Sequence, residues 1–88
     1  MASVVMYCTA ACPYCQSAER LLAQKGVREL NRIRVDLEPA RRAEMMQRSG
    51  RRTVPQIWIG ERHVGGYDDL HALERAGQLD QLLHAAQT

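Results

Sequence analysis

Two cysteines three positions apart, Cys12 and Cys15, stand where an extended apolar run gives way to a helical pattern. The unpaired N–H groups and partial positive charge of a helix N-terminus stabilise a thiolate, the form of cysteine that attacks disulfides. Pro13 fits the first turn of that helix, where its missing N–H costs nothing. Cys15 lies one turn further on, close enough to attack a mixed disulfide on Cys12. The segment therefore predicts a redox dithiol with Cys12 as the nucleophile.

Length and composition limit the kind of protein that carries this dithiol. The 88 residues, 45% of them hydrophobic, are enough for a single small domain over residues 1–88. No apolar run approaches the roughly 20 residues that cross a bilayer, and no charged segment followed by an apolar one indicates a secretion signal. Three cysteines near the N-terminus are too few for a secreted disulfide framework. We expect a cytoplasmic protein that does not bind membranes.

The charge of the chain gives a weaker indication of its ligand. A formal net charge of +2 is too small to argue for nucleic acid, so we expect no nucleic-acid partner. Lys25 is the only lysine among the 12 basic residues, and the others are arginines. Because the planar guanidinium binds a carboxylate through two parallel hydrogen bonds, this composition favours an anionic small molecule as ligand.

The hydrophobic pattern predicts an α/β domain in which strands and helices alternate before a hairpin and a final helical region. The turn at Gly60 suits a β-hairpin, Asp68 is expected to be the N-cap of the last helical region, and Gly77 interrupts that region. The expected strands and helices, in chain order, cover residues 3–7, 13–25, 32–35, 39–50, 56–59, 62–64 and 68–83. A βαβ half followed by a ββα half, with a dithiol in the first βα turn, predicts a thioredoxin-like fold with a four-stranded mixed sheet flanked by helices.

Several separated motifs resemble one family of this fold. They are Tyr7, Cys12-Pro13-Tyr14-Cys15, Thr53-Val54-Pro55-Gln56-Ile57 and Gly65-Gly66-Tyr67-Asp68-Asp69-Leu70. In order and spacing they resemble the dithiol glutaredoxins, most closely the small bacterial glutaredoxin 3 type. The resemblance covers nearly the whole chain, and several motifs in the family's order make a chance match improbable.

The resemblance implies a site for glutathione as co-substrate. Pro55 is expected to be cis and to lie against the dithiol, so that the backbone of Val54 pairs with the cysteinyl part of glutathione. The backbone of Gly66-Tyr67-Asp68 is expected to bind the γ-glutamyl carboxylate, and the Asp68 carboxylate its ammonium. The remaining contacts implied for glutathione come from Tyr14, Arg42 and Thr53, with Tyr14 walling the groove and Arg42 facing the glycine carboxylate.

The resemblance also implies an activity, that of a glutathione-dependent thiol-disulfide oxidoreductase. The thiolate of Cys12 would reduce protein disulfides and glutathione mixed disulfides, with Cys15 as the resolving thiol and a Cys12–Cys15 disulfide as the oxidised form. Expected partners are glutathionylated or disulfide-containing proteins such as ribonucleotide reductase-like substrates. We expect a monomer with no metal, since His63, His71 and His84 show no spacing that would complete a zinc site with the dithiol.

Two residues depart from the family's usual pattern. Thr9 stands where many glutaredoxins carry a lysine that stabilises the thiolate, which leaves this task to the helix terminus. Cys8 completes a Cys-x3-Cys-x2-Cys spacing that also occurs in radical enzymes with an iron–sulfur cluster. Such enzymes need a much larger barrel, so we expect Cys8 to be a buried and unreactive thiol at the end of the first strand.

Three other functions remain open at the level of sequence. In an iron–sulfur carrier, two subunits would share a cluster through Cys12 and two glutathione molecules, but Pro13 and Tyr14 disfavour it because carriers typically have glycine, phenylalanine and serine in this loop. A redoxin served by thioredoxin reductase should lack the Gly65–Leu70 segment. An adaptor domain that only binds peptides would not need Cys15.

Overall fold

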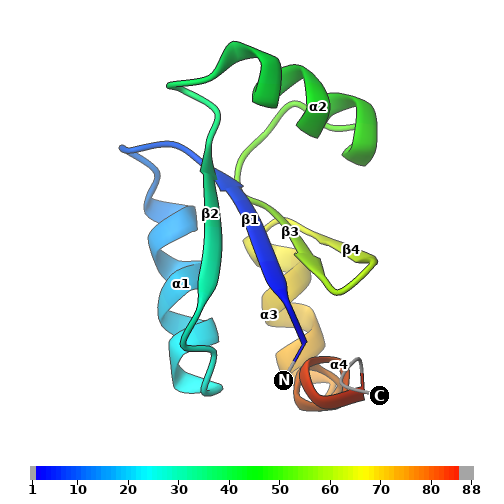
Figure 1. Cartoon of the computed structure of the whole chain (residues 1–88). Helices are drawn as coiled ribbons and strands as arrows, with labels where there is room; N and C mark the ends of the chain where they lie inside the picture. The colour runs from blue at the N-terminus through cyan, green and yellow to red at the C-terminus, as the bar shows by residue number, and fades with distance from the viewer. Residues whose placement is uncertain (1, 86–88) are drawn as a thin grey trace.

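The computed structural model describes residues 2–85, which form a four-stranded mixed sheet with helices on both faces (Figure 1). The strand order is β2-β1-β3-β4, with β1 parallel to β2 and antiparallel to β3, and with β3 antiparallel to β4. The predicted thioredoxin-like arrangement is therefore confirmed. The elements in chain order are β1 (Val4–Cys8), α1 (Pro13–Gln24), β2 (Leu30–Arg34), α2 (Pro39–Ser49), β3 (Gln56–Ile59), β4 (Arg62–Gly65), α3 (Tyr67–Arg75) and α4 (Leu79–Ala85).

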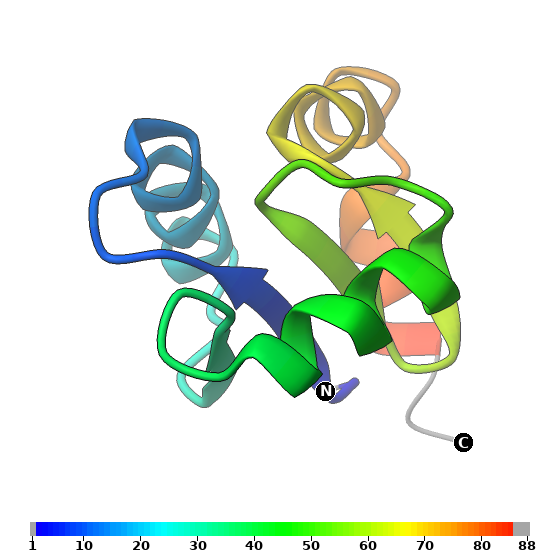
Figure 2. The same cartoon turned by 90° about the horizontal axis from the view of Figure 1, so that it is seen from above.

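The central strand β1 is buried on both faces, and its side chains alternate between two apolar layers. Val4, Met6 and Cys8 contribute to the layer beneath α1 and α3, while Tyr7 contributes to the layer beneath α2. Figure 2 shows this arrangement from above, with α2 on one side of the sheet and α1 and α3 on the other. Burial on both sides fixes the register of β1, because a slip by one residue would exchange the two layers.

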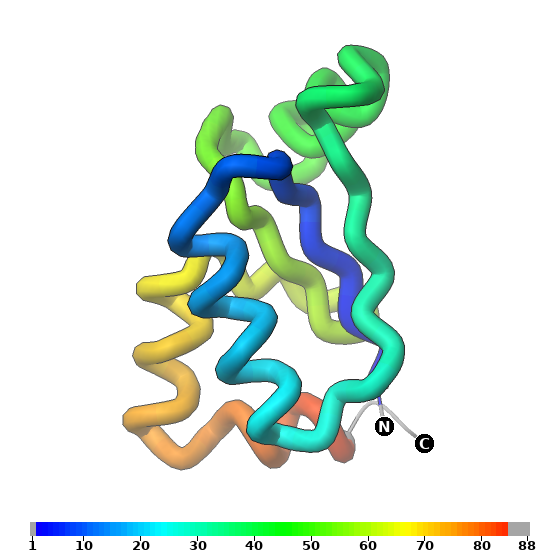
Figure 3. The backbone as a smooth tube through the Cα atoms, turned by 90° about the vertical axis from the view of Figure 1, so that its left-hand side faces the viewer, coloured from blue at the N-terminus to red at the C-terminus, as the bar shows by residue number. Residues whose placement is uncertain are grey.

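Helices α1, α3 and α4 cover one face of the sheet and enclose the larger part of the core. The tube in Figure 3 shows α1 and α3 side by side, with α4 crossing below them. Ala18 and Leu22 of α1 pack against Leu70 of α3, and Leu79 and Leu83 of α4 close the cluster. The predicted break in the last helical region is confirmed, since Gly77 has a positive φ of 72° between α3 and α4. This layer holds α1, and with it the dithiol, in place.

Helix α2 covers the second face at the end of β1, where the polypeptide turns toward the dithiol. Met45 of α2 is fully buried beside Tyr7 and Trp58. The guanidinium of Arg48 lies 4.4 Å from the Trp58 ring centroid and donates a 2.7 Å hydrogen bond to the Tyr7 hydroxyl, which in turn donates to Glu44. A charged residue thus caps the apolar layer without leaving a buried polar group unpaired.

The second strand differs from its predicted position of residues 32–35, since β2 begins at Leu30 and ends at Arg34. The reason is pairing rather than local sequence. All five residues of β2 pair with the five residues of β1, from Val4 opposite Leu30 to Cys8 opposite Arg34. Val35 has no partner in this ladder beyond the hydrogen bond that its N–H donates to the Cys8 carbonyl.

The expected N-cap of the last helical region is wrong by two residues. Helix α3 begins at Tyr67, and its N-cap is Gly66 rather than Asp68. The carboxylate of Asp69, three residues after the N-cap, accepts a 2.9 Å hydrogen bond from the Gly66 N–H. An acidic side chain at this position satisfies a backbone donor that the helix leaves unpaired, so Asp69 serves the cap and Asp68 is free to face solvent.

Candidate active site

The dithiol lies at the N-terminus of α1, as predicted. Cys12 is the N-cap residue with an extended backbone, and its Sγ accepts a 3.1 Å hydrogen bond from the backbone N–H of Cys15. Pro13 occupies the first turn. The two sulfurs are in disulfide contact, with the Cα atoms 5.2 Å apart. Only the sulfur of Cys12 receives a helix N–H, so the helix terminus favours negative charge there.

Both cysteines are nearly buried, with 7% of Cys12 and 3% of Cys15 exposed. The sulfur of Cys12 is 4.0 Å from the Val54 carbonyl oxygen, which places the Thr53-Val54-Pro55 loop directly beside it. The Val54–Pro55 peptide bond is cis, which confirms the sequence prediction. The Thr53–Pro55 loop therefore flanks the sulfur of Cys12, which is slightly more exposed than Cys15.

A groove of about 190 Å³ opens next to this loop. Its walls are Tyr14, the Thr53–Pro55 loop, the Gly66–Asp69 segment and Arg51. The structure thus brings together seven of the eight residues predicted to contact glutathione, from three separated parts of the chain. Tyr14 is 63% exposed, so it stands at the rim and offers its ring to a ligand.

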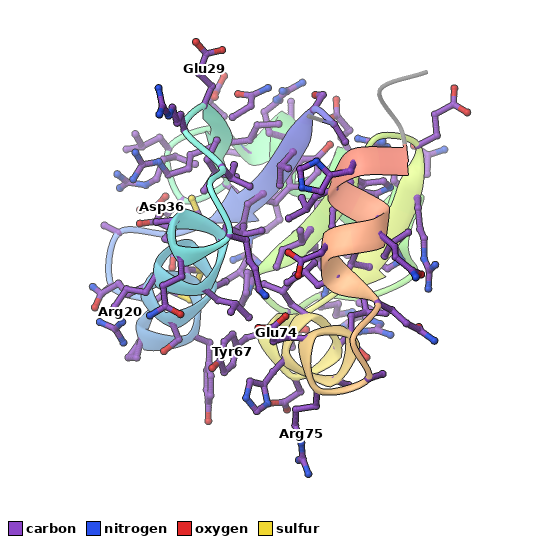
Figure 4. The ribbon with its side chains drawn as sticks, turned by 90° about the horizontal axis from the view of Figure 1, so that it is seen from below. Arg20, Glu29, Asp36, Tyr67, Glu74 and Arg75 are labelled. Atoms are coloured by element: carbon purple, nitrogen blue, oxygen red, sulfur yellow. A yellow bond between two sulfur atoms is a disulfide. The ribbon has the colours of Figure 1, made fainter. Side chains whose placement is uncertain are left out.

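The Gly66–Asp69 wall presents the first turn of α3 to the groove. Asp68 is exposed and belongs to none of the ion pairs among residues 2–85. Tyr67 lies in the space between α1 and α3 in Figure 4, whereas Arg75, at the other end of α3, points away from the molecule. The wall therefore carries one exposed carboxylate close to backbone N–H groups of a helix terminus.

Arg42 is not brought to the groove with the other predicted contacts. It lies exposed on α2 and is not among the residues that line the groove, so its contact with glutathione stays a prediction. The guanidinium that does line the groove belongs to Arg51, which sequence reasoning missed together with Asp69. Asp69 could have been found from the sequence, because an acidic residue three positions after a helix N-cap is a known capping pattern. Arg51 had no such signal, because its partner lies 18 residues further along the chain.

The loop before Cys12 is tied to the end of β2 by Asp36. Its carboxylate accepts two 2.7 Å hydrogen bonds from the guanidinium of Arg34 and a longer one, 3.4 Å, from the backbone N–H of Ala10. Hydrogen bonding to Arg34 lowers the pKa of Asp36 to about 2. The carboxylate therefore stays ionised at neutral pH, where it keeps its ion pair with Arg34 and its longer contact with Ala10.

A second cavity, of about 350 Å³, lies on the β2 side of the dithiol and is lined by all three cysteines. Arg32 and Arg34 also line it, but Arg32 pairs with Glu19 at 3.1 Å and Arg34 with Asp36. These paired guanidinium groups do not replace the lysine that many glutaredoxins carry at the position of Thr9. The structure therefore leaves the helix terminus as the main support for a thiolate at Cys12.

Cys8 is 3% exposed at the end of β1, which confirms the predicted burial. Burial raises the pKa of the Cys8 thiol, so it resists forming the reactive thiolate. We expect Cys8→Ser to leave activity nearly unchanged and to lower the free energy of unfolding by about 1 kcal/mol, measured by urea denaturation. Peptide mapping of protein oxidised with glutathione disulfide provides the check. A high yield of Cys8 linked to Cys12 or to glutathione would contradict this prediction.

Neither the far end of the sheet nor a metal-binding cluster among residues 2–85 offers competing chemistry. A larger hollow of about 660 Å³ lies at the far end of the sheet, between residues 2–4 and 26–31, and contains no cysteine or histidine. No cluster of three or more His, Cys, Asp or Glu side chains within residues 2–85 is suited to hold a metal ion. None of the helices in this range is long and apolar enough to span a membrane.

A disulfide at a helix N-terminus, beside a cis-proline loop on a thioredoxin-like sheet, defines a thiol-disulfide oxidoreductase. The glutaredoxin family model matches residues 4–64. The chain is 60% identical to a glutaredoxin of Pseudomonas aeruginosa over 97% of this chain and 100% of that protein. It is 51% identical to glutaredoxin 3 of Escherichia coli over 94% and 99% of the two chains. The chain therefore belongs to the glutaredoxin family.

Solved structures agree with this assignment. A glutaredoxin from Brucella melitensis has a TM-score of 0.85 and 52% identity, covering 100% of this chain and 95% of that one. A buckwheat glutaredoxin in complex with glutathione has a TM-score of 0.87 and 32% identity, covering 96% of this chain and 78% of that one. These similarities show the fold and the general class of thiol oxidoreductase.

Proposed function

We propose that the protein reduces glutathione mixed disulfides and protein disulfides with glutathione as the electron donor. The observation that carries this proposal is the groove next to the cis-proline loop, whose Val54 carbonyl oxygen is 4.0 Å from the Cys12 sulfur, with this loop on one wall and a helix N-terminus on the other. The loop offers the backbone of Val54 to a peptide, and the helix terminus offers N–H groups to a carboxylate. Glutathione is a short peptide with a free carboxylate at each end. Its peptide backbone suits the loop, and its γ-glutamyl carboxylate suits the helix terminus.

In the monothiol route the Cys12 thiolate attacks the glutathione sulfur of a mixed disulfide. A bond forms between Cys12 and that sulfur, the old disulfide bond breaks, and the substrate thiolate leaves and takes up a proton. A second glutathione thiolate then attacks the same glutathione sulfur. Glutathione disulfide leaves, and Cys12 returns to its thiolate form without any need for Cys15.

In the dithiol route the Cys12 thiolate attacks a protein disulfide and forms a mixed disulfide with the substrate. Cys15 then attacks the Cys12 sulfur, which releases the substrate as a dithiol and leaves the Cys12–Cys15 disulfide. The 5.2 Å separation of the two Cα atoms allows this bond without movement of the backbone. Two glutathione molecules reduce it and leave as glutathione disulfide.

The test is turnover of a peptide whose cysteine carries glutathione, with glutathione, glutathione reductase and NADPH. We expect NADPH oxidation that depends on the protein and saturates with the peptide. Reduction of the protein by thioredoxin reductase but not by glutathione would contradict the proposal. It would indicate a redoxin that is served by thioredoxin reductase. A visible absorbance band in freshly purified protein would instead support the iron–sulfur carrier.

A further inference from the structure

An ion pair joins the two walls of the groove. The Nη1 atom of Arg51, two residues before Thr53, lies 2.9 Å from Oδ2 of Asp69 in the first turn of α3. Both residues line the groove, one on each side. The contact connects segments 18 residues apart in sequence. Its position indicates that it fixes the spacing between the walls.

The same carboxylate oxygen also determines the backbone before α3. Oδ2 of Asp69 accepts a 2.9 Å hydrogen bond from the N–H of Gly66, so one oxygen joins the guanidinium to the backbone that faces the groove. Gly65 packs against this pair with φ at 115°, and a Cβ atom there would lie 2.9 Å from Nη1 of Arg51 and in collision with the Asp69 carboxylate. The turn is therefore packed closely against the pair.

We propose that Arg51 is a positioning residue, which through Asp69 holds the Gly66–Asp68 backbone where the γ-glutamyl end of glutathione binds. This inference rests on the proposed function. The adjacent aspartates then have different tasks, because Asp69 faces Arg51 and the backbone while Asp68 is free for the ligand.

The pair also controls charge at this wall. Hydrogen bonding from Arg51 lowers the pKa of Asp69, so its carboxylate is ionised in the working range of pH. Without the guanidinium, that negative charge would lie uncompensated beside the N–H groups that are to bind the ligand's carboxylate. Loss of Arg51 therefore weakens ligand binding in two ways, through a looser backbone and through repulsion.

The test compares Arg51→Gln with Arg62→Gln. Arg62 is exposed on β4, has no ion pair within residues 2–85, and its replacement changes the net charge equally. Turnover of a protein disulfide is measured against glutathione concentration, because in the dithiol route free glutathione itself enters the groove when it attacks the Cys12–Cys15 disulfide. We expect Arg51→Gln to raise KM for glutathione about two- to fivefold, the effect of a half-exposed ion pair, with kcat close to that of the wild type. Arg62→Gln is expected to keep both constants.

Two further measurements separate positioning from a general loss of structure. Dithiothreitol, which has no γ-glutamyl group, should reduce the Cys12–Cys15 disulfide of Arg51→Gln at the wild-type rate. Arg51→Lys should recover part of the affinity, since it keeps the charge and one donor. An unchanged KM in Arg51→Gln, or an equal slowing with dithiothreitol, would overturn the proposal.

A double variant decides whether Arg51 acts through Asp69. Asp69→Asn removes the charge but keeps an oxygen that accepts from Gly66. If the two residues act as a unit, Arg51→Gln with Asp69→Asn raises KM no more than Arg51→Gln alone. Additive increases would instead make Arg51 a direct ligand contact and overturn its positioning role. A wild-type protein that shows no saturable use of glutathione would overturn the proposed function itself, before any variant is compared.

Discussion

Replacement of Cys12 by serine is expected to abolish turnover of every disulfide substrate, whereas Cys15→Ser keeps the reduction of glutathione mixed disulfides and loses that of protein disulfides. The reason is the asymmetry of the pair, because the sulfur of Cys12 receives the helix N–H and lies beside the Val54 carbonyl. A hydroxyl at this position is too weak a nucleophile to replace the thiolate. The measurement is NADPH oxidation, coupled through glutathione reductase, with a glutathionylated peptide and with a protein disulfide as substrates.

Cys8→Ser is the matched control, since it also removes a buried thiol from the cavity beside the dithiol. It should keep both activities. A second readout is the rate of alkylation of the reduced protein, which should remain high for Cys12 at a pH where a free cysteine is protonated. Equal loss in Cys12→Ser and Cys15→Ser on the glutathionylated peptide would contradict the assignment of roles.

The fold follows from sequence signals that are strong at short range. Apolar residues on both faces of β1 predict a central strand, and Gly60 between two short extended runs predicts the β3–β4 hairpin. The dithiol and Pro13 indicate where α1 begins. These signals depend on residues close together in the chain, so the order of the elements and the mixed sheet could be derived before the structure.

The errors arise where a distant partner decides the local structure. The edge strand β2 has exposed Asn31 and Arg32, so its own pattern does not reveal that Leu30 already pairs with Val4. Pairing with β1 determines where it begins and ends. Edge strands are weakly marked in sequence because only one side of their backbone and part of their side chains are buried.

The candidate site divides in the same way. The residues around the sulfur and the Thr53–Pro55 loop are recognisable because each motif is continuous in sequence. Arg51 and Asp69 form their contact only once α3 has packed beside the loop. The sequence therefore showed two adjacent aspartates without revealing which of them pairs with Arg51. Arg42 was predicted to face the glycine carboxylate because it lies on the helix before the Thr53–Pro55 loop, but α2 places it on an exposed surface outside the groove.

Removal of the Asp68 carboxylate should have the second large effect. If this exposed side chain pairs with the γ-glutamyl ammonium, Asp68→Ala loses a charged hydrogen bond and raises KM for glutathione by about tenfold or more. The kcat should change little, because Asp68 does not touch the reacting sulfurs. Steady-state kinetics at varied glutathione concentration, with a protein disulfide in excess so that free glutathione itself enters the groove, measure both constants.

The structure provides controls that separate a ligand contact from a helix-terminus effect. Glu61→Ala removes an equally exposed carboxylate from the hairpin and should leave KM unchanged. A reductant without the γ-glutamyl group, such as dithiothreitol, should reduce Asp68→Ala at the wild-type rate. Asp68 also lies in the first turn of α3, where any carboxylate favours the helix dipole. Equal effects on glutathione and dithiothreitol would therefore show that Asp68 acts only on the helix, and that another group must meet the ammonium of the ligand.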